Sequence, residues 1–415
     1  MKKKIIGICV LTLLIGTVIP LSAQNITSDY EKYVQPALLS GGFFNKYGGS
    51  GTDAFKEIDL THDGCYIAVG ETQVGDTRDA WMVKIDSVGE VIWEITHGTS
   101  AGWDGLFPVI TTSDGGYLGG GWFYNSSQED FDALLIKTNE DGEVSWIETY
   151  GGEGRDEFFG LLETGNGYFC VGISFSFSDS KNGYLAKVDF DGNLIWQKIF
   201  EKEGFITELD EIIVSNVNDG YILSGGYSNP TYPPQGWILK IDEEGNVIWD
   251  NSFGKPLLFD WCTTIANTND DCYIVAGGTR GGTLALGFIG TDIWLMKVDN
   301  EGNMLWEKNH GVPLLKDYSL SVQPTSDGGF VFTGHTIGIG AFGDAAFAAW
   351  SKIWLVKTDQ NGDINWSKRM AGNGHGRCVK VLSDDGFLIS GYEGEGHASN
   401  SEYAIMIRTD QNGDI

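Results

Sequence analysis

The sequence predicts an all-β fold, a single seven-bladed β-propeller with four-stranded antiparallel blades. Three observations lead to this prediction. Two short signatures each recur seven times along the 415 residues, glycine and aromatic residues are abundant, and the two ends of the chain complement each other as parts of one repeat. Short antiparallel strands repeated with regular turn signals are typical of propeller blades.

The first signature is a basic residue followed two positions later by Asp or Asn and, after three more positions, by Gly. The basic residues are Lys84, Lys137, Lys187, Lys240, Lys297, Lys357 and Arg408. Asp opens and Gly closes a tight turn between two strands. Six repeats continue to a Trp four residues after the glycine, and this Trp is expected to pack between neighbouring blades: Trp93, Trp146, Trp196, Trp249, Trp306 and Trp366.

The second signature is an aromatic residue four positions before a glycine. The glycines are Gly70, Gly121, Gly172, Gly225, Gly277, Gly334 and Gly391. Asp-Gly pairs such as Asp63-Gly64 stand just upstream and are strong hairpin signals, because glycine accepts the positive φ that these turns require. Each repeat therefore predicts four strands, which in the first repeat span residues 53–60, 66–72, 80–86 and 90–96.

The chain ends predict how the ring closes. The seventh repeat stops at Ile415, two residues short of its Trp, and a matching segment stands near the N-terminus, FFNKYG from Phe43. We expect this segment to complete blade seven and so remove an open sheet edge. An open solenoid and two smaller propellers are the alternatives, but neither requires complementary chain ends.

The first residues have the layout of a signal peptide. Three lysines precede a mostly apolar stretch over residues 5–19, and small residues lead to Ala23. The expected organisation is a signal peptide over 1–23, a short leader over 24–37 and the propeller over 38–415. We expect a secreted protein at the cell surface or in the periplasm, without stable membrane insertion after cleavage; a retained anchor is the alternative. The formal net charge of -30 argues against nucleic acid as a partner.

Three segments carry a resemblance to a known class: GGSGTD from Gly48, TSDGGY from Thr112 and KIDEEGNVIW from Lys240. They resemble the extracellular β-propeller repeats of bacteria and archaea, most closely those of SBBP type and more distantly quinoprotein (PQQ-like) repeats. The resemblance covers residues 42–415. It implies the fold but no particular function, because such propellers serve many roles.

Enzyme signatures are missing from the sequence. It contains no GxSxG elbow, HExxH helix, P-loop or CxxC pair, so we predict no catalytic residues and no cofactor. The turn that begins at Asp189 resembles a calcium loop, but its glycine comes fourth rather than sixth, so we interpret it as a plain hairpin turn and predict no metal site.

The first candidate ligand-binding group opens the first strand of the repeats. It comprises Asp53, Asp104, Asp156, Asp260 and Asp317; by alignment His375 takes this place in blade seven, and Asp210 lies one residue off register in blade four. Either each Asp accepts hydrogen bonds from its own loop, or the acids form a ring at one mouth of the channel that attracts a cationic ligand.

The second candidate group lies in two long loops between the second and third strands, over residues 279–291 and 335–352. These loops carry Phe288, Phe342, Phe347 and Trp350. Exposed apolar loop residues often mark interaction sites, although the two loops could equally cover each other. The sequence thus predicts a secreted, non-catalytic binding module that uses blades five and six to bind an extracellular protein or a glycan. The alternative is a propeller enzyme, of lyase or glycosidase type, with acids at the channel mouth.

Overall fold

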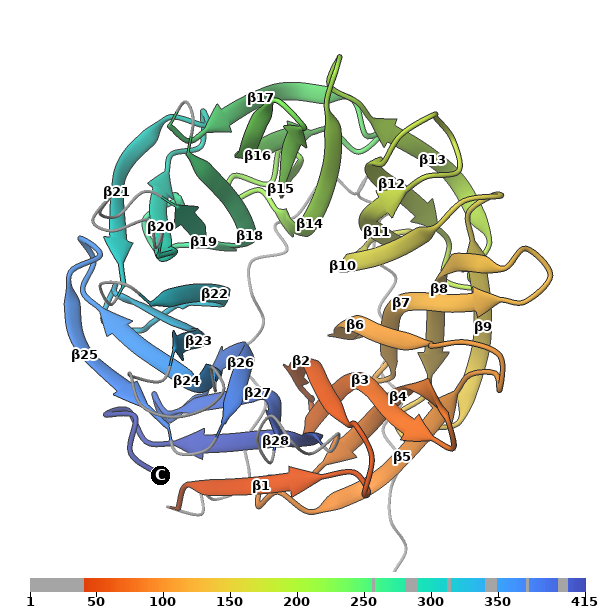
Figure 1. Ribbon diagram of the computed structural model, residues 1–415, viewed down its shortest axis with the longest axis horizontal. Coiled ribbons are helices and arrows are strands. Elements are labelled where there is room, and N and C mark those ends of the chain that lie inside the picture. Colours follow the sequence, from red (N-terminus) through yellow and green to blue (C-terminus); the bar gives the residue numbers. More distant parts are fainter. Residues whose placement is uncertain are drawn as a thin grey trace, which may run out of the picture. The chain divides into compact units, whose positions relative to one another are not determined.

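The computed structural model describes residues 41–415, except for 256–257, 281–289, 312–314, 340–348, 371–372 and 395–401. The described residues form seven four-stranded antiparallel sheets, which are the blades of a seven-bladed β-propeller (Figure 1). The predicted fold class is therefore confirmed. Within the described part of the chain, no helix has the length and apolar character needed to cross a membrane.

The strands follow one another blade by blade along the chain. Blades one to three contain β2 (Ala54–Leu60), β3 (Tyr66–Val74), β4 (Thr77–Ile85), β5 (Val91–His97), β6 (Gly105–Thr111), β7 (Tyr117–Asn125), β8 (Asp130–Thr138), β9 (Val144–Tyr150), β10 (Asp156–Thr164), β11 (Gly167–Ser174), β12 (Asn182–Val188) and β13 (Leu194–Phe200). Blades four to seven contain β14 (Ile206–Val214), β15 (Tyr221–Asn229), β16 (Tyr232–Ile241), β17 (Val247–Phe253), β18 (Phe259–Asn267), β19 (Tyr273–Arg280), β20 (Asp292–Val298), β21 (Met304–His310), β22 (Lys316–Pro324), β23 (Phe330–Ile339), β24 (Ala349–Thr358), β25 (Ile364–Arg369), β26 (Gly374–Val381), β27 (Phe387–Gly394), β28 (Glu402–Thr409) and β1 (Phe43–Tyr47).

The first strand of each blade is its innermost strand. Neighbouring innermost strands contact one another all the way round, from β2 through β6, β10, β14, β18 and β22 to β26, which contacts β2 again (Figure 1). These seven strands therefore surround the middle of the ring, and their side chains line it.

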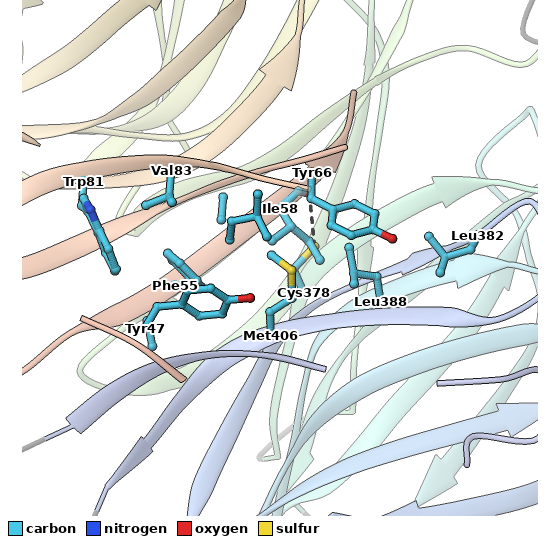
Figure 2. Close-up of a cluster of buried hydrophobic side chains, with 13 residues drawn as sticks. Tyr47, Phe55, Ile58, Tyr66, Trp81, Val83, Cys378, Leu382, Leu388 and Met406 are labelled. Carbon is cyan, nitrogen blue, oxygen red and sulfur yellow. Dashed lines mark hydrogen bonds between the residues drawn. The ribbon is translucent and has the colours of Figure 1, made fainter. Parts of the chain in front are cut away.

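The N-terminal strand closes the ring as predicted. β1 pairs antiparallel with β28, from Phe43 opposite Arg408 to Tyr47 opposite Ala404. Tyr47 then joins Phe55 and Trp81 of blade one and Met406 of blade seven in a single buried cluster (Figure 2). Because this cluster unites the two ends of the described chain, closure is a packing interaction as well as a strand pairing.

The strand-end tryptophans pack across the blade boundaries, as expected. The indole Nε1 of Trp93 donates to the carbonyl oxygen of Glu140 in blade two at 3.2 Å, and its ring lies against Gly142 of the same turn. A Cβ on Gly142 would lie 2.6 Å from that ring. At the closure, the ring of Phe43 lies against Gly89 in the same way. Phe43 thus takes the position that the strand-end Trp has in the other six blades.

In six of the seven blades, the basic residue of the repeat forms an ion pair. Its charged head group, buried in the sheet, forms an ion pair with the Asp of the first turn in the same blade: Lys84–Asp63, Lys137–Asp114, Lys240–Asp219, Lys297–Asp270, Lys357–Asp327 and Arg408–Asp384. Although burial raises the pKa of Asp114, hydrogen bonds from Thr112 and Lys137 lower it to about 2. This carboxylate therefore stabilises the fold above about pH 4, and its contribution is lost as the pH falls through 2.

Blade three lacks this acid, because Asn166 stands at the turn. Burial lowers the pKa of Lys187 to about 8, below its ordinary 10.5. The folded state thus disfavours the protonated lysine, and this cost fades as the pH rises from about 8 towards 10.5. We expect Asn166→Asp to raise the free energy of unfolding at pH 7 by about 1 kcal/mol and to abolish the gain in stability at alkaline pH. Urea denaturation of both proteins at pH 7 and pH 10 measures this; an equal alkaline gain in the variant would contradict it.

Candidate functional site

Every innermost strand carries a β-bulge at the same position. The pairing register shifts after Phe55, Leu106, Phe158, Leu209, Cys262, Ser319 and Gly376, each of which lies opposite the glycine of the second signature. A Cβ on any of these glycines would lie only 1.7 to 2.1 Å from a carbonyl oxygen of the bulged strand. The glycines therefore allow the bulges to form, and a bulge redirects the side chain that it inserts.

The inserted residues form a ring, one per blade, which we call the bulge ring: Lys56, Phe107, Phe159, Asp210, Thr263, Leu320 and Arg377. All seven line a cavity of about 610 Å³, here named the central cavity, whose walls come from all seven innermost strands. Bulges are frequent beside binding sites, and pockets of this size hold small ligands. The central cavity is therefore the candidate functional site.

The two sides of the central cavity differ in character. Blades two and three contribute an apolar wall, in which Phe107 and Phe159 meet edge to face with ring centroids 5.7 Å apart, and Leu161 lies beside them. Charged side chains come from blades seven, one and four: Arg377, Lys380, Lys56, Glu57, Asp59, Asp210 and Glu211. A mainly apolar pocket with a few convergent polar groups is the usual form of a small-molecule site.

Several of these charges compensate one another. Lys380 Nζ lies 3.5 Å from Asp59 and 3.8 Å from Glu57, and Lys56 pairs with Glu71 at 3.0 Å. Burial raises the pKa of Glu57 to about 7, against the opposing charge of Lys380. Burial also raises the pKa of Glu211 to about 8, and the negative charge of Glu57 adds to this rise. Both carboxyl groups are therefore partly protonated close to neutral pH.

Arg377 is an exception. Its guanidinium lies 5.8 Å from the ring centroid of Phe107 and 5.7 Å from that of Tyr392, so aromatic faces surround it. Its Nε is buried without a hydrogen-bond partner, and no carboxylate of the described residues forms an ion pair with it. Arg377 is half-buried, and charged groups that are partly withdrawn from water are normally paired, so a guanidinium without a carboxylate partner in a cavity is a candidate anion-binding group.

A row of aromatic rings and imidazoles continues from Arg377 into blade six. Ring centroids are separated by 4.7 Å between Tyr392 and His375, 4.1 Å between His375 and His335, and 5.0 Å between His335 and Tyr318. Burial lowers the pKa of His335 to about 3 and that of His375 to about 4, and Arg377 lowers both further. Both imidazoles are therefore neutral at pH 7, and Arg377 is the cation of this row.

The predicted aspartates lie at the corners where one blade leads into the next. Asp53, Asp104, Asp156, Asp260 and Asp317 are each 2% exposed or less. Asp104, for example, accepts hydrogen bonds from the amides of Thr99 at 2.9 Å and Tyr124 at 2.6 Å. Asp53 and Asp260 likewise accept from the amides of Gly49 and Lys255. This geometry favours the structural interpretation, because the carboxylates face their own corners.

The strand pairing in blades seven and four shows that His375 and Asp210 do not occupy the position of Asp53. Gly374, not His375, corresponds to Asp53, because Gly376 pairs with Gly391 as Phe55 pairs with Gly70. In blade four the corresponding residue is Thr207, and Asp210 lies three residues further on, in the bulge ring. The aligned position is not an aspartate in these two blades but Gly374 and Thr207. The sequence alignment therefore chose the nearby polar residues His375 and Asp210 instead.

The aromatic loop residues fall largely beyond the described structure. Phe288, Phe342 and Phe347 lie outside the described residues, and Trp350 belongs to β24. The expected loop over 335–352 is too long, because β23 extends to Ile339 and β24 begins at Ala349. Thr336 opposite Lys352 and Ile337 opposite Ser351 continue the hairpin there.

Sequence reasoning missed Arg377, Lys56, Phe107 and Phe159, because the bulge ring has a different residue in almost every blade and so forms no repeated motif. One signal was present: each ring residue lies three positions after the residue aligned with Asp53, and directly after the residue that pairs with a signature glycine.

Comparison with known proteins gives the fold. No protein-family model matches the chain, and no curated protein matches it in sequence. Among solved structures it is similar to the Pan2 WD40 domain of Neurospora crassa, with a TM-score of 0.52 and 10% identity over 87% of this chain and 90% of that one. It is also similar to the polysaccharide lyase Uly1, with a TM-score of 0.51 and 8% identity over 92% and 95% of the two chains. A streptogramin B lyase aligns with a TM-score of 0.49 and 12% identity over 88% and 97%. These neighbours are β-propellers that include enzymes and non-enzymes, so the likeness shows a propeller and no activity.

Proposed function

We propose that the protein is an exported, non-catalytic binding propeller that takes the carboxylate-bearing end of an extracellular ligand into the central cavity. Its signal-peptide pattern supports export. The observation that carries the proposal is Arg377, a guanidinium between two aromatic faces without a carboxylate partner in the described structure. Arginine is suited to this role, because its planar fork binds a carboxylate through two parallel hydrogen bonds.

The binding site is then the central cavity, which blades five and six help to enclose, rather than the loops of these two blades. Thr263 of blade five and Leu320 of blade six stand in the bulge ring, and Tyr318 and His335 of blade six continue the aromatic row from Arg377. Aromatic faces beside a charged anchor suit either a peptide side chain or a sugar ring. Both a peptide end and an acidic sugar carry the carboxylate that Arg377 requires.

Arg377→Gln tests the proposal. We expect wild-type protein to bind at least one of two probes, the tripeptide Ala-Phe-Ala or digalacturonate, and the variant to bind it at least about tenfold more weakly, a loss of about 1.4 kcal/mol or more. Isothermal titration calorimetry measures both affinities. Arg369→Gln is the matched control, because it removes an equal charge from an exposed residue of β25.

Two outcomes would count against the proposal: neither probe binds the wild-type protein, or Arg377→Gln binds as tightly as wild type. Thermal unfolding of the variant should change little, since the described residues give Arg377 no hydrogen bond or ion pair to lose. The enzymatic alternative would now use Glu57 and Glu211 of the cavity rather than the buried corner aspartates. Conversion of a bound probe during the titration would favour that alternative.

A further inference from the structure

A carboxyl group without a cation partner among the described residues stands opposite Arg377 in the central cavity. Asp210 occupies the bulge-ring position of blade four, and Arg377 occupies that of blade seven. Blades three positions apart are as far apart as a ring of seven permits. The two residues thus stand on opposite walls of one cavity: Arg377 is a cation, and Asp210 is a carboxyl group that a bound cation would ionise.

Asp210 has no cation of its own. Among the described residues its carboxylate forms no ion pair or hydrogen bond, and its neighbours Glu208 and Glu211 are acids. The nearby Lys181 is already paired with Glu208 at 2.6 Å. Burial, followed by the charge of Glu208, raises the pKa of Asp210 well above its usual range. The site would therefore be stabilised by a positively charged group.

The two groups do not neutralise each other. Arg377 contacts Phe107 and Tyr392, and no ion pair joins it to Asp210 in the described part of the chain. The two lysines of the cavity are paired as well, Lys380 with Asp59 and Glu57, and Lys56 with Glu71. A molecule with an anion at one end and a cation at the other could reach both walls, where its anion would pair with Arg377 and its cation would stabilise the ionised form of Asp210.

The wall between the two charges is apolar. Phe107 and Phe159 come from blades two and three, and Leu161 of blade three and Ile212 of blade four also line the cavity. The volume of about 610 Å³ suits a small peptide, whose side chain would cover this surface. The net charge of the protein also favours a zwitterionic ligand. A protein with a formal charge of -30 repels a purely anionic ligand at long range but does not repel a zwitterion.

We infer that the ligand is a short zwitterionic peptide, with its carboxylate on Arg377, its free amino group on Asp210 and an apolar side chain against Phe107 and Phe159. This inference rests on the proposed function and assigns its ligand class. It identifies Asp210, Phe107 and Phe159 as specificity-determining residues.

The test compares Ala-Phe-Ala with its N-acetylated and C-amidated forms by calorimetry. For wild-type protein, blocking either end should weaken binding at least about tenfold. For Asp210→Asn, the free tripeptide should bind at least about tenfold more weakly than to wild type, and acetylation should then change the affinity less than about twofold, since the partner of the amino group is gone. Asp141→Asn is the matched control, because it removes a carboxylate from an exposed turn of blade two.

The outcomes separate this inference from the proposed function. If acetylation leaves wild-type affinity unchanged while Arg377→Gln still abolishes binding, the ligand is an anion and the zwitterion is wrong, although the proposed function stands. Tighter binding of digalacturonate than of Ala-Phe-Ala would replace the peptide by an acidic sugar. If wild type binds no probe, both fail. The acetylation result needs no variant, so it holds even if Asp210→Asn folds poorly.

Discussion

Deletion of residues 41–48 is expected to prevent the protein from folding into a soluble ring. The deletion removes β1, so that β28 of blade seven loses its outer partner along its length, from Ala404 to Arg408. It also removes Phe43, Phe44 and Tyr47 from the packing on both sides of blade seven. Three such side chains contribute together about 4–9 kcal/mol, which is comparable with the whole stability of many domains. The exposed edge would also favour aggregation.

A circular permutant provides the control for this deletion. Gly42 lies directly beside Ile415, since a Cβ on it would be 2.6 Å from the carbonyl carbon of Ile415. Residues 42–48 joined directly behind Ile415 should therefore form the missing strand as an ordinary hairpin and restore a cooperative thermal transition. Circular dichroism and size-exclusion chromatography of the three proteins measure this. A soluble, cooperatively folded deletion variant would contradict the closure described above.

Gly172→Ala is expected to destabilise the protein by more than about 3 kcal/mol. The added Cβ would lie 1.9 Å from the carbonyl oxygen of Glu157 and 2.9 Å from Cα of Phe158. Both atoms belong to the backbone of the bulged strand β10, so no side-chain rotation relieves the clash and the bulge itself would have to shift. Overpacking of this kind costs about 1–3 kcal/mol when side chains can yield, and more when they cannot.

Gly165→Ala in the same blade is the matched control, because no atom lies within 4 Å of the position of its Cβ. We expect its free energy of unfolding to stay within about 0.5 kcal/mol of wild type. Chemical denaturation monitored by tryptophan fluorescence compares the two variants. A Gly172→Ala protein as stable as Gly165→Ala would show that the bulge does not depend on the glycine.

The fold could be predicted because its determinants repeat. Turn glycines, strand-end tryptophans and the basic residues each recur in nearly every blade, and Phe43 completes the pattern at the closure. The ion pairs were not predicted, although both partners were visible, because Lys84 and Asp63 belong to different signatures that only the hairpin brings together.

The site could not be predicted in the same way, because function here depends on the positions where the repeats differ. Asp53 and its counterparts recur because each blade corner needs the same hydrogen bonds. Their repetition therefore indicated a structural role rather than a binding site. Arg377 and Asp210 occur once each, and they come to stand on opposite walls of one cavity only when the seven innermost strands close into a ring. The repeated residues thus identified the fold, whereas the residues that differ from blade to blade line the central cavity.

A crystal structure of the protein grown with Ala-Phe-Ala would show whether Arg377 binds the carboxylate of a ligand in the central cavity. We expect the tripeptide within the bulge ring, with its carboxylate oxygens about 2.7–2.9 Å from the guanidinium nitrogens of Arg377. An Arg377 side chain paired with a carboxylate of the protein itself, with the peptide absent or bound elsewhere, would contradict this expectation.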